Sequence, residues 1–170
     1  VTTIAASPSA DITALFAPLD SDGTSAHSTF AADITINVSD TSIAASTLNI
    51  LDAATAGTIT VSATTITGSA ADINTAYASS GFSGLGDEAV TVTDTTVEAS
   101  VLNTLNSNTT GLVTATSVAT LTGTAAAINT LVGNEGNSGD KVNLDSDYVA
   151  TLSDTTITAT VLNAVNGNVP

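Results

Sequence analysis

The chain has 170 residues, with one lysine, one histidine and sixteen aspartates or glutamates, and its formal net charge is −15 at pH 7. Such a field repels phosphate backbones and anionic membrane surfaces, which excludes nucleic acid and acidic lipids as partners. The sequence has no run of about 18 apolar residues, so no membrane span is expected. Hydrophobic residues make up 42% of the chain and recur regularly, which argues against disorder.

The absence of cysteine excludes a disulfide framework and leaves the redox compartment open. An acidic, threonine-rich, lysine-poor composition is typical of secreted surface proteins, although salt-adapted proteins share it. The first residues, 1–4, carry no basic start of a secretory signal, as expected of a mature chain or an internal segment. The expected location is therefore extracellular or at the cell surface.

The chain is a single repeat array, 1–170, of six units of two kinds. The A units contain VTVTDTTVEASVLNTLNSNTTG (90–111), INVSDTSIAASTLNILDAATAG (36–57) and ATLSDTTITATVLNAVNGN (150–168). The B units contain ITVSATTITGSAADINTAY (59–77) and VTATSVATLTGTAAAINTL (113–131), and residues 2–16 match their latter part. In chain order the units span roughly 1–16 (B), 34–58 (A), 59–79 (B), 89–112 (A), 113–132 (B) and 142–168 (A), with long links at 17–33, 80–88 and 133–147.

Each unit is expected to form a strand, a turn, a second strand and a short helix. Residues 90–92 alternate apolar and polar side chains, as in a half-buried strand. An aspartate follows in each A unit and is expected to hold the turn by bonding its own backbone: Asp40, Asp94 and Asp154. An apolar stripe at helical spacing comes next, as at Val101, Leu102 and Leu105, or at Ile128, Leu131 and Val132. These helices are too short to be stable alone, so stacking must hold them.

The fold class predicted is α/β, a solenoid of strand-turn-strand-helix units, with a mainly-β solenoid carrying short helices as the alternative. Two strands about 4.8 Å apart match the spacing of one packed helix, so two strands per helix are expected. The helices lie either in one layer or on opposite faces. One apolar residue per unit is expected to stack on its neighbour in the next unit: Ile4, Ile43, Ile66, Val97, Leu121 and Ile157.

An asparagine follows the first inward-facing leucine or isoleucine of the helix in five units. These residues are Asn49, Asn74, Asn103, Asn129 and Asn163. An asparagine in this position can bond the backbone of the adjoining unit and build a ladder. A ligand-binding row is the alternative, but it would need flanking aromatic or charged residues, which the sequence lacks.

At VLNTLNSNTTG and TLTGTAAAINTL the sequence resembles the long, repeat-rich cell-surface proteins of marine cyanobacteria, over about residues 34–168. The resemblance implies a scaffold for surface attachment, filaments or motility. It supplies no catalytic residue.

Calcium is the candidate ligand of the long links, which hold nine of the sixteen acidic residues. Asp20-Ser-Asp22-Gly23 begins like an oxygen-ligand loop, although Ala31 stands where an EF-hand would have its closing glutamate. The candidate calcium ligands are Asp20, Asp22, Glu135, Asp140, Asp145 and Asp147. The alternative is that the link acids are simply solvated.

No enzyme is expected. His27 is the only histidine, and its neighbours Ser28 and Asp22 lie in the same link, whereas a hydrolase triad is held by rigid elements. Asp87 and Glu88 imitate a glycosidase pair, but the chain has no tryptophan to stack sugars. The glycines of residues 81–86 are interpreted as a flexible link.

The expected function is a structural repeat module of an extracellular or cell-surface filament or array. The alternative is a calcium-assisted adhesin-like module whose acidic link face binds a cell-surface or polysaccharide partner. The first unit lacks its first strand, and the last unit stops after its helix. We therefore expect both ends to meet further repeats, either of the same chain or of other copies packed head to tail.

Overall fold

The computed structural model describes residues 3–16, 32–135 and 142–168. Twelve strands and six helices follow one another in this part of the chain. Their order is β1 (Thr3–Ser7), α1 (Ser9–Phe16), β2 (Thr35–Val38), β3 (Ser42–Ala44), α2 (Ala45–Ala54), β4 (Ile59–Val61), β5 (Thr65–Gly68), α3 (Ala70–Ala78), β6 (Phe82–Ser83), β7 (Ala89–Val92), β8 (Thr96–Glu98), α4 (Ala99–Asn108), β9 (Val113–Ala115), β10 (Thr120–Gly123), α5 (Ala125–Val132), β11 (Val142–Leu144), β12 (Val149–Leu152) and α6 (Ala159–Asn168).

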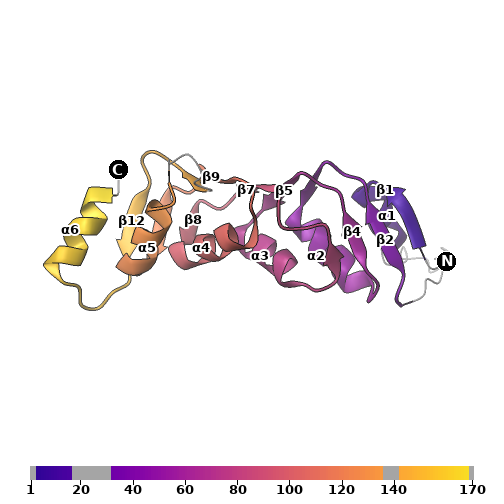
Figure 1. The fold of residues 1–170 in the computed structure, drawn as a ribbon, viewed down its shortest axis with the longest axis horizontal. Coiled ribbons are helices and arrows are strands. Elements are labelled where there is room, and N and C mark those ends of the chain that lie inside the picture. Colours follow the sequence, from indigo (N-terminus) through magenta and orange to yellow (C-terminus); the bar gives the residue numbers. More distant parts are fainter. Residues whose placement is uncertain (1–2, 17–31, 136–141, 169–170) are drawn as a thin grey trace, which may run out of the picture.

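The α/β class predicted from the sequence is confirmed. The paired strands are all parallel and form three open sheets, in the orders β1-β2-β4-β6, β3-β5-β7-β9-β11 and β8-β10-β12. None of these sheets closes into a barrel. Each helix packs against the next one along the chain, so the helices of both kinds of unit form one row rather than two opposed layers. In Figure 1 the helices lie in chain order along the long axis of the molecule, with α1 near one end and α6 at the other.

Strand pairing passes from one pair of units to the next in a regular way. Within a pair, the first strands of the A and B units are neighbours (β2–β4 and β7–β9), and so are the second strands (β3–β5 and β8–β10). The second strand of each B unit then pairs with the first strand of the following A unit: β1–β2, β5–β7 and β10–β12. Each sheet is therefore shared between two successive pairs of units.

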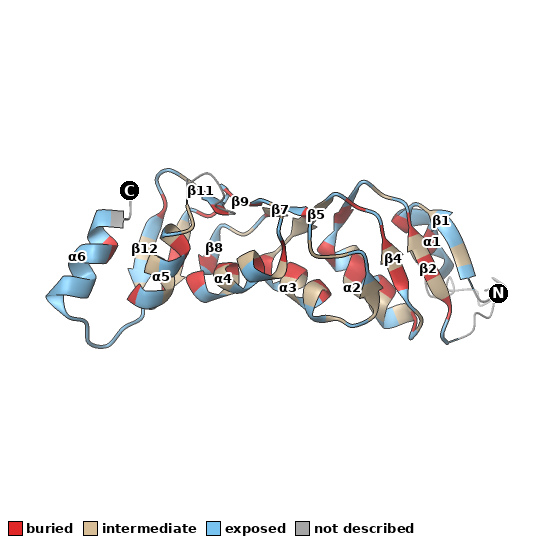
Figure 2. Cartoon of the chain, viewed as in Figure 1, coloured by how far each residue is buried: buried red, intermediate tan, exposed pale blue. Residues whose placement is uncertain are grey.

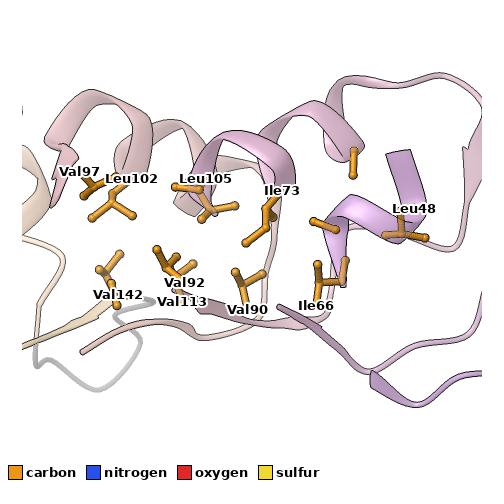
Figure 3. Packing of buried hydrophobic residues seen from close by; sticks show 14 of the residues in the cluster. Leu48, Ile66, Ile73, Val90, Val92, Val97, Leu102, Leu105, Val113 and Val142 are labelled. Carbon is orange, nitrogen blue, oxygen red and sulfur yellow. The ribbon is translucent and has the colours of Figure 1, made fainter. Parts of the chain in front are cut away.

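The core follows these ladders. Ile43, Ile66, Val90, Val113 and Val142 stand in register across the central sheet, and all five are buried. Helix residues such as Leu48, Ile73 and Leu102 close the core from the other side (Figure 3). Burying a side chain of this size contributes about 1.5–3 kcal/mol, so the ladders hold helices that would be unstable alone.

The expected stacking of one apolar residue per unit is only partly correct. Ile43 lies beside Ile66, and Val97 beside Leu121, as expected. The expectation is wrong between pairs of units, because Ile66 lies beside Val90 and Ile4 beside Ile36. In both cases the first strand of the next A unit takes the place that its second strand was expected to fill.

Two of the long links contain strands that the sequence did not predict. Phe82–Ser83 forms β6 beside β4, and Val142–Leu144 forms β11 beside β9. A full pair of units therefore contributes five strands for two helices, rather than two strands per helix. The interpretation of residues 81–86 as a flexible link is wrong: Gly84 has φ +86°, and any side chain there would collide with the carbonyl oxygen of Val61.

Candidate functional site

The six candidate calcium ligands divide into two groups. Asp20, Asp22 and Asp140 lie outside the described residues, as does His27. The other three, Glu135, Asp145 and Asp147, lie around β11. Within residues 3–16, 32–135 and 142–168, no three His, Cys, Asp or Glu side chains come close enough together to hold a metal ion.

Asp145 and Asp147 form a carboxylate pair between β11 and β12. The pKa of Asp147 is raised above its usual value, first by a side-chain hydrogen bond with Asp145 and then by the negative charge of Asp145. Two carboxylates that raise a pKa in this way repel each other once both are ionised. A bound cation would relieve that repulsion.

Glu135 and Tyr148 also lie near β11, and burial is the main cause of the raised pKa of each. The pKa of Glu135 is raised by burial, against the effect of a hydrogen bond from the backbone of Leu144. Burial and the nearby charge of Glu135 raise the pKa of Tyr148 to about 12. The Tyr148 hydroxyl is buried and has no hydrogen-bond partner.

Glu88 is not a solvated link acid. It is buried, and its Oε2 accepts hydrogen bonds from the Tyr77 hydroxyl and the Gly86 amide, both at 2.9 Å. Burial and the charge of Glu88 raise the pKa of Tyr77 above its ordinary value. Asp87 is exposed, so the adjacent acids face different surroundings and do not form the glycosidase-like pair considered above. The nearby tyrosine in the preceding helix was the available signal, and sequence reasoning did not use it.

The asparagine ladder is confirmed where its hydrogen bonds are described. The side-chain amide donates to a carbonyl of the next helix from Asn49 to Asp72 (3.1 Å), from Asn74 to Val101 (3.1 Å) and from Asn103 to Ala127 (2.9 Å). The acceptor is in each case the third residue of that helix. The row therefore fixes the position of each helix relative to the next.

The turn aspartates act across units rather than within their own turns, which corrects the prediction. A carboxylate oxygen accepts from the first amide of the preceding B-unit helix: Asp40 from Ser9 (2.6 Å), Asp94 from Ala70 (2.7 Å) and Asp154 from Ala125 (2.7 Å). The first amides of a helix have no partner inside it, and its N-terminus favours negative charge. Each A unit thus caps the helix of the B unit before it.

An open core surface, here called the C face, lies on the last A unit and comprises Ile157, Val161 and Leu162. The side chain of Leu162 is 44% exposed, whereas Leu102, at the same place in α4, is fully buried. Figure 2 shows α6 as almost entirely exposed, in contrast to the buried stripes of the inner helices. The C face therefore consists of apolar side chains of the kind that the next B unit covers in the inner A units.

The first B unit presents a second open surface, the N face, formed by Ile4 and Leu15. Leu15 is the seventh residue of α1 and is 44% exposed, whereas Leu131, the seventh residue of α5, is fully buried. Ile4 is only partly buried, although its equivalents Ile66 and Leu121 are fully buried. Sequence reasoning did not identify either face by its residues; the repeated helix position was the signal.

Among the described residues, no helix is long and apolar enough to cross a membrane. Comparison of the chain with protein-family models, with curated proteins and with solved structures gives no match.

Proposed function

We propose that the chain is a structural repeat module of an extracellular or cell-surface array, and that it is not an enzyme. Its units belong to an α/β solenoid in which each unit is completed by the next. The observation that carries this proposal is the continuity of the contacts between units. Strand ladders, asparagine amides and aspartate caps all cross from one unit to another.

These contacts suit a load-bearing scaffold. No helix in the described part of the chain exceeds ten residues, so each depends on its neighbours for stability. In stacked repeats, stability is a sum of unit terms and nearest-neighbour interface terms, and the array grows by adding units. The resemblance to cyanobacterial surface proteins favours the same role outside the cell.

The test is immunogold electron microscopy of the cells that make the protein. We expect label on the cell surface or on released material, in linear or lattice-like arrays. Label confined to the cell interior, or scattered singly without any array, would contradict the proposal.

A calcium-assisted adhesin-like module is the second candidate. It is favoured by the Asp145–Asp147 pair, in which a side-chain hydrogen bond with Asp145 and then the negative charge of Asp145 raise the pKa of Asp147. In this candidate a calcium ion bound at the link acids orders the acidic face, which then binds a polysaccharide or another cell-surface partner. The cation titration at the end of the Discussion tests it.

A further inference from the structure

The contact between an A unit and the B unit that follows it, here called the A–B interface, occurs twice in the described chain. It joins residues 34–58 to 59–79, and residues 89–112 to 113–132. In both copies the second strands pair in parallel, with Ile43 opposite Ile66 and Val97 opposite Leu121. The two helices of each copy also pack side by side.

Two kinds of hydrogen bond recur at each A–B interface. A threonine carbonyl at the turn of the A unit accepts from a threonine amide of the B unit, Thr41 from Thr65 at 3.2 Å and Thr95 from Thr120 at 3.0 Å. The helix asparagine of the A unit bonds the third carbonyl of the B helix. These contacts define one geometry by which a B unit covers an A unit.

The last A unit shows what this surface is like when no B unit covers it. Residues 42–44 and 96–98 are strands in the inner A units, each paired to a B unit, whereas the equivalent residues 156–158 are not a strand. The apolar residues around them form the exposed C face. The second strand of an A unit is thus present where a B unit pairs with it.

We propose that the C face of one copy binds the N face of a second copy, forming a third A–B interface between molecules. This inference rests on the proposed function and specifies its partner. The occupant is a second copy because its first described unit, β1 and α1, is a B unit, and a B unit covers each inner A unit in the same way. The contact continues an interface that the fold already uses twice.

The inner copies predict the contacts of this intermolecular interface. Ile157 lies opposite Ile4 of the second copy, and residues 156–158 become a strand beside β1. The carbonyl of Thr155 accepts from the amide of Thr3, and the Asn163 side chain donates to the carbonyl of Asp11, the third residue of α1. Because the two faces differ, the contact does not close on itself and extends into a filament.

The experiment uses the untagged chain, with mass measured by analytical ultracentrifugation from micromolar to millimolar concentration. Leu162→Asp places a charge on the C face, and Leu15→Asp places one on the N face. We expect each variant alone to weaken self-association about 30-fold or more, as for a central interface residue. Their mixture retains one intact C face and one intact N face, and should form dimers without longer species.

Ile50→Asp is the matched control, because Ile50 is an exposed apolar residue of α2 that belongs to neither face. It should leave self-association unchanged. Circular dichroism of each variant checks folding, which should survive because the substituted side chains are exposed. Hydrogen exchange gives an independent readout: in the wild-type chain, amides of residues 156–158 should become protected as concentration rises.

Other outcomes overturn the inference in distinguishable ways. Loss of association in Leu162→Asp alone would indicate tail-to-tail pairing, and association unaffected by both variants would indicate lateral contacts. Either result leaves the surface-array function intact. A wild-type chain that stays monomeric at every concentration, without protection of residues 156–158, also overturns the inference, whereas the array function is judged separately by the labelling of cells.

Discussion

Asn103 is the residue at which the cost of losing one rung of the asparagine ladder is easiest to measure. Its amide donates to the carbonyl of Ala127 in the next helix, at 2.9 Å. Asn103→Ala removes this bond between units and should lower the free energy of unfolding by about 1 kcal/mol. The measurement is the midpoint of urea unfolding at constant slope.

Thr104→Ala is the control for this substitution, since Thr104 is exposed and bonds only within its own helix, to Ser100. It should be neutral or slightly stabilising, because alanine favours helix more than threonine does. Equal destabilisation by the two variants would mean that the ladder contributes nothing specific.

Tyr148 gives a prediction about alkaline pH. Its pKa is raised from 10 to about 12 in the folded chain, because burial disfavours the charged form. The unfolded state therefore loses its proton first, and stability that is present below pH 10 is lost as pH rises towards about 12. Tyr148→Phe should reduce this loss and leave stability at pH 7 unchanged or higher, because the hydroxyl has no partner.

Ultraviolet absorbance of tyrosinate provides the measurement, since Tyr77 and Tyr148 are the only tyrosines and the chain has no tryptophan. The native chain should show little tyrosinate at a pH slightly above 10, where the denatured chain is largely ionised. A native titration that matches the denatured one would contradict the shift.

Sequence reasoning at this scale succeeded where one residue type recurs in one place. The asparagine row was predicted to bond the backbone of the adjoining unit because five of the six described helices repeat it. Glu88 was misplaced because its equivalents are dissimilar: Ile34 and Tyr148 occupy the same position before the first strand, and both are buried. Because the residue at this buried position differs in every A unit, no repeated residue type marks it as buried in the sequence.

At the scale of whole elements, B-unit helices and A-unit helices begin differently. In α3 and α5 the third amide donates to the side chain of the helix's own N-cap residue, Ser69 or Thr124. The first amide donates to the aspartate of the next A unit. The N-cap positions of α2 and α4 make no side-chain bond. B units have two more residues than A units before the helix. In residues 59–79 these are Gly68 and Ser69, and Ser69 is the N-cap that accepts the bond.

Asp94→Ala should therefore destabilise the chain by about 1 kcal/mol, because the first amide of α3 loses its acceptor. Asp94→Asn keeps an acceptor oxygen without the charge and should recover part of the loss. Glu98→Ala is the matched control: it removes one charge beside α4, where no cap bond exists, and should be close to neutral. Thermal unfolding compares the three, and a Glu98→Ala loss as large as that of Asp94→Ala would refute the cap.

The strands and helices of the units were predictable from alternation and helical spacing, and so was the pairing of second strands within a pair of units, but the pairing between successive pairs was not. Strand β5 has two candidate neighbours of similar sequence on the following A unit, β7 and β8, and both alternate suitably. The presence of β6 beside β4 leaves β7 as the partner of β5. A two-residue strand in a glycine-rich link gives no periodic signal, so the arrangement follows from tertiary packing.

At the scale of the whole molecule, the same sequence pattern produces buried or exposed surfaces according to what lies next to it. Leu102 and Leu162 have closely similar surroundings in the sequence, but among the described residues a B unit covers Leu102 and none covers Leu162. Each A unit carries the residues of an A–B interface, and the interface forms where a B unit packs against them. That is why the sequence predicted that both ends meet further repeats but did not identify the residues that form the two faces.

The net charge of −15 acts on the molecule as a whole and provides the last prediction. Sodium chloride should raise the melting temperature modestly by screening repulsion among the carboxylates. If the link acids bind calcium, calcium chloride at matched ionic strength should raise the melting temperature further.

Replacing both Asp145 and Asp147 by asparagine should abolish that further rise. The same double substitution should slightly stabilise the calcium-free chain by removing the mutual repulsion of the two carboxylates. Asp33→Asn with Asp87→Asn removes two charges from exposed link residues and should retain the further rise. Equal effects of the two salts on the wild-type chain would retire the calcium-assisted candidate and leave the structural array as the single proposal.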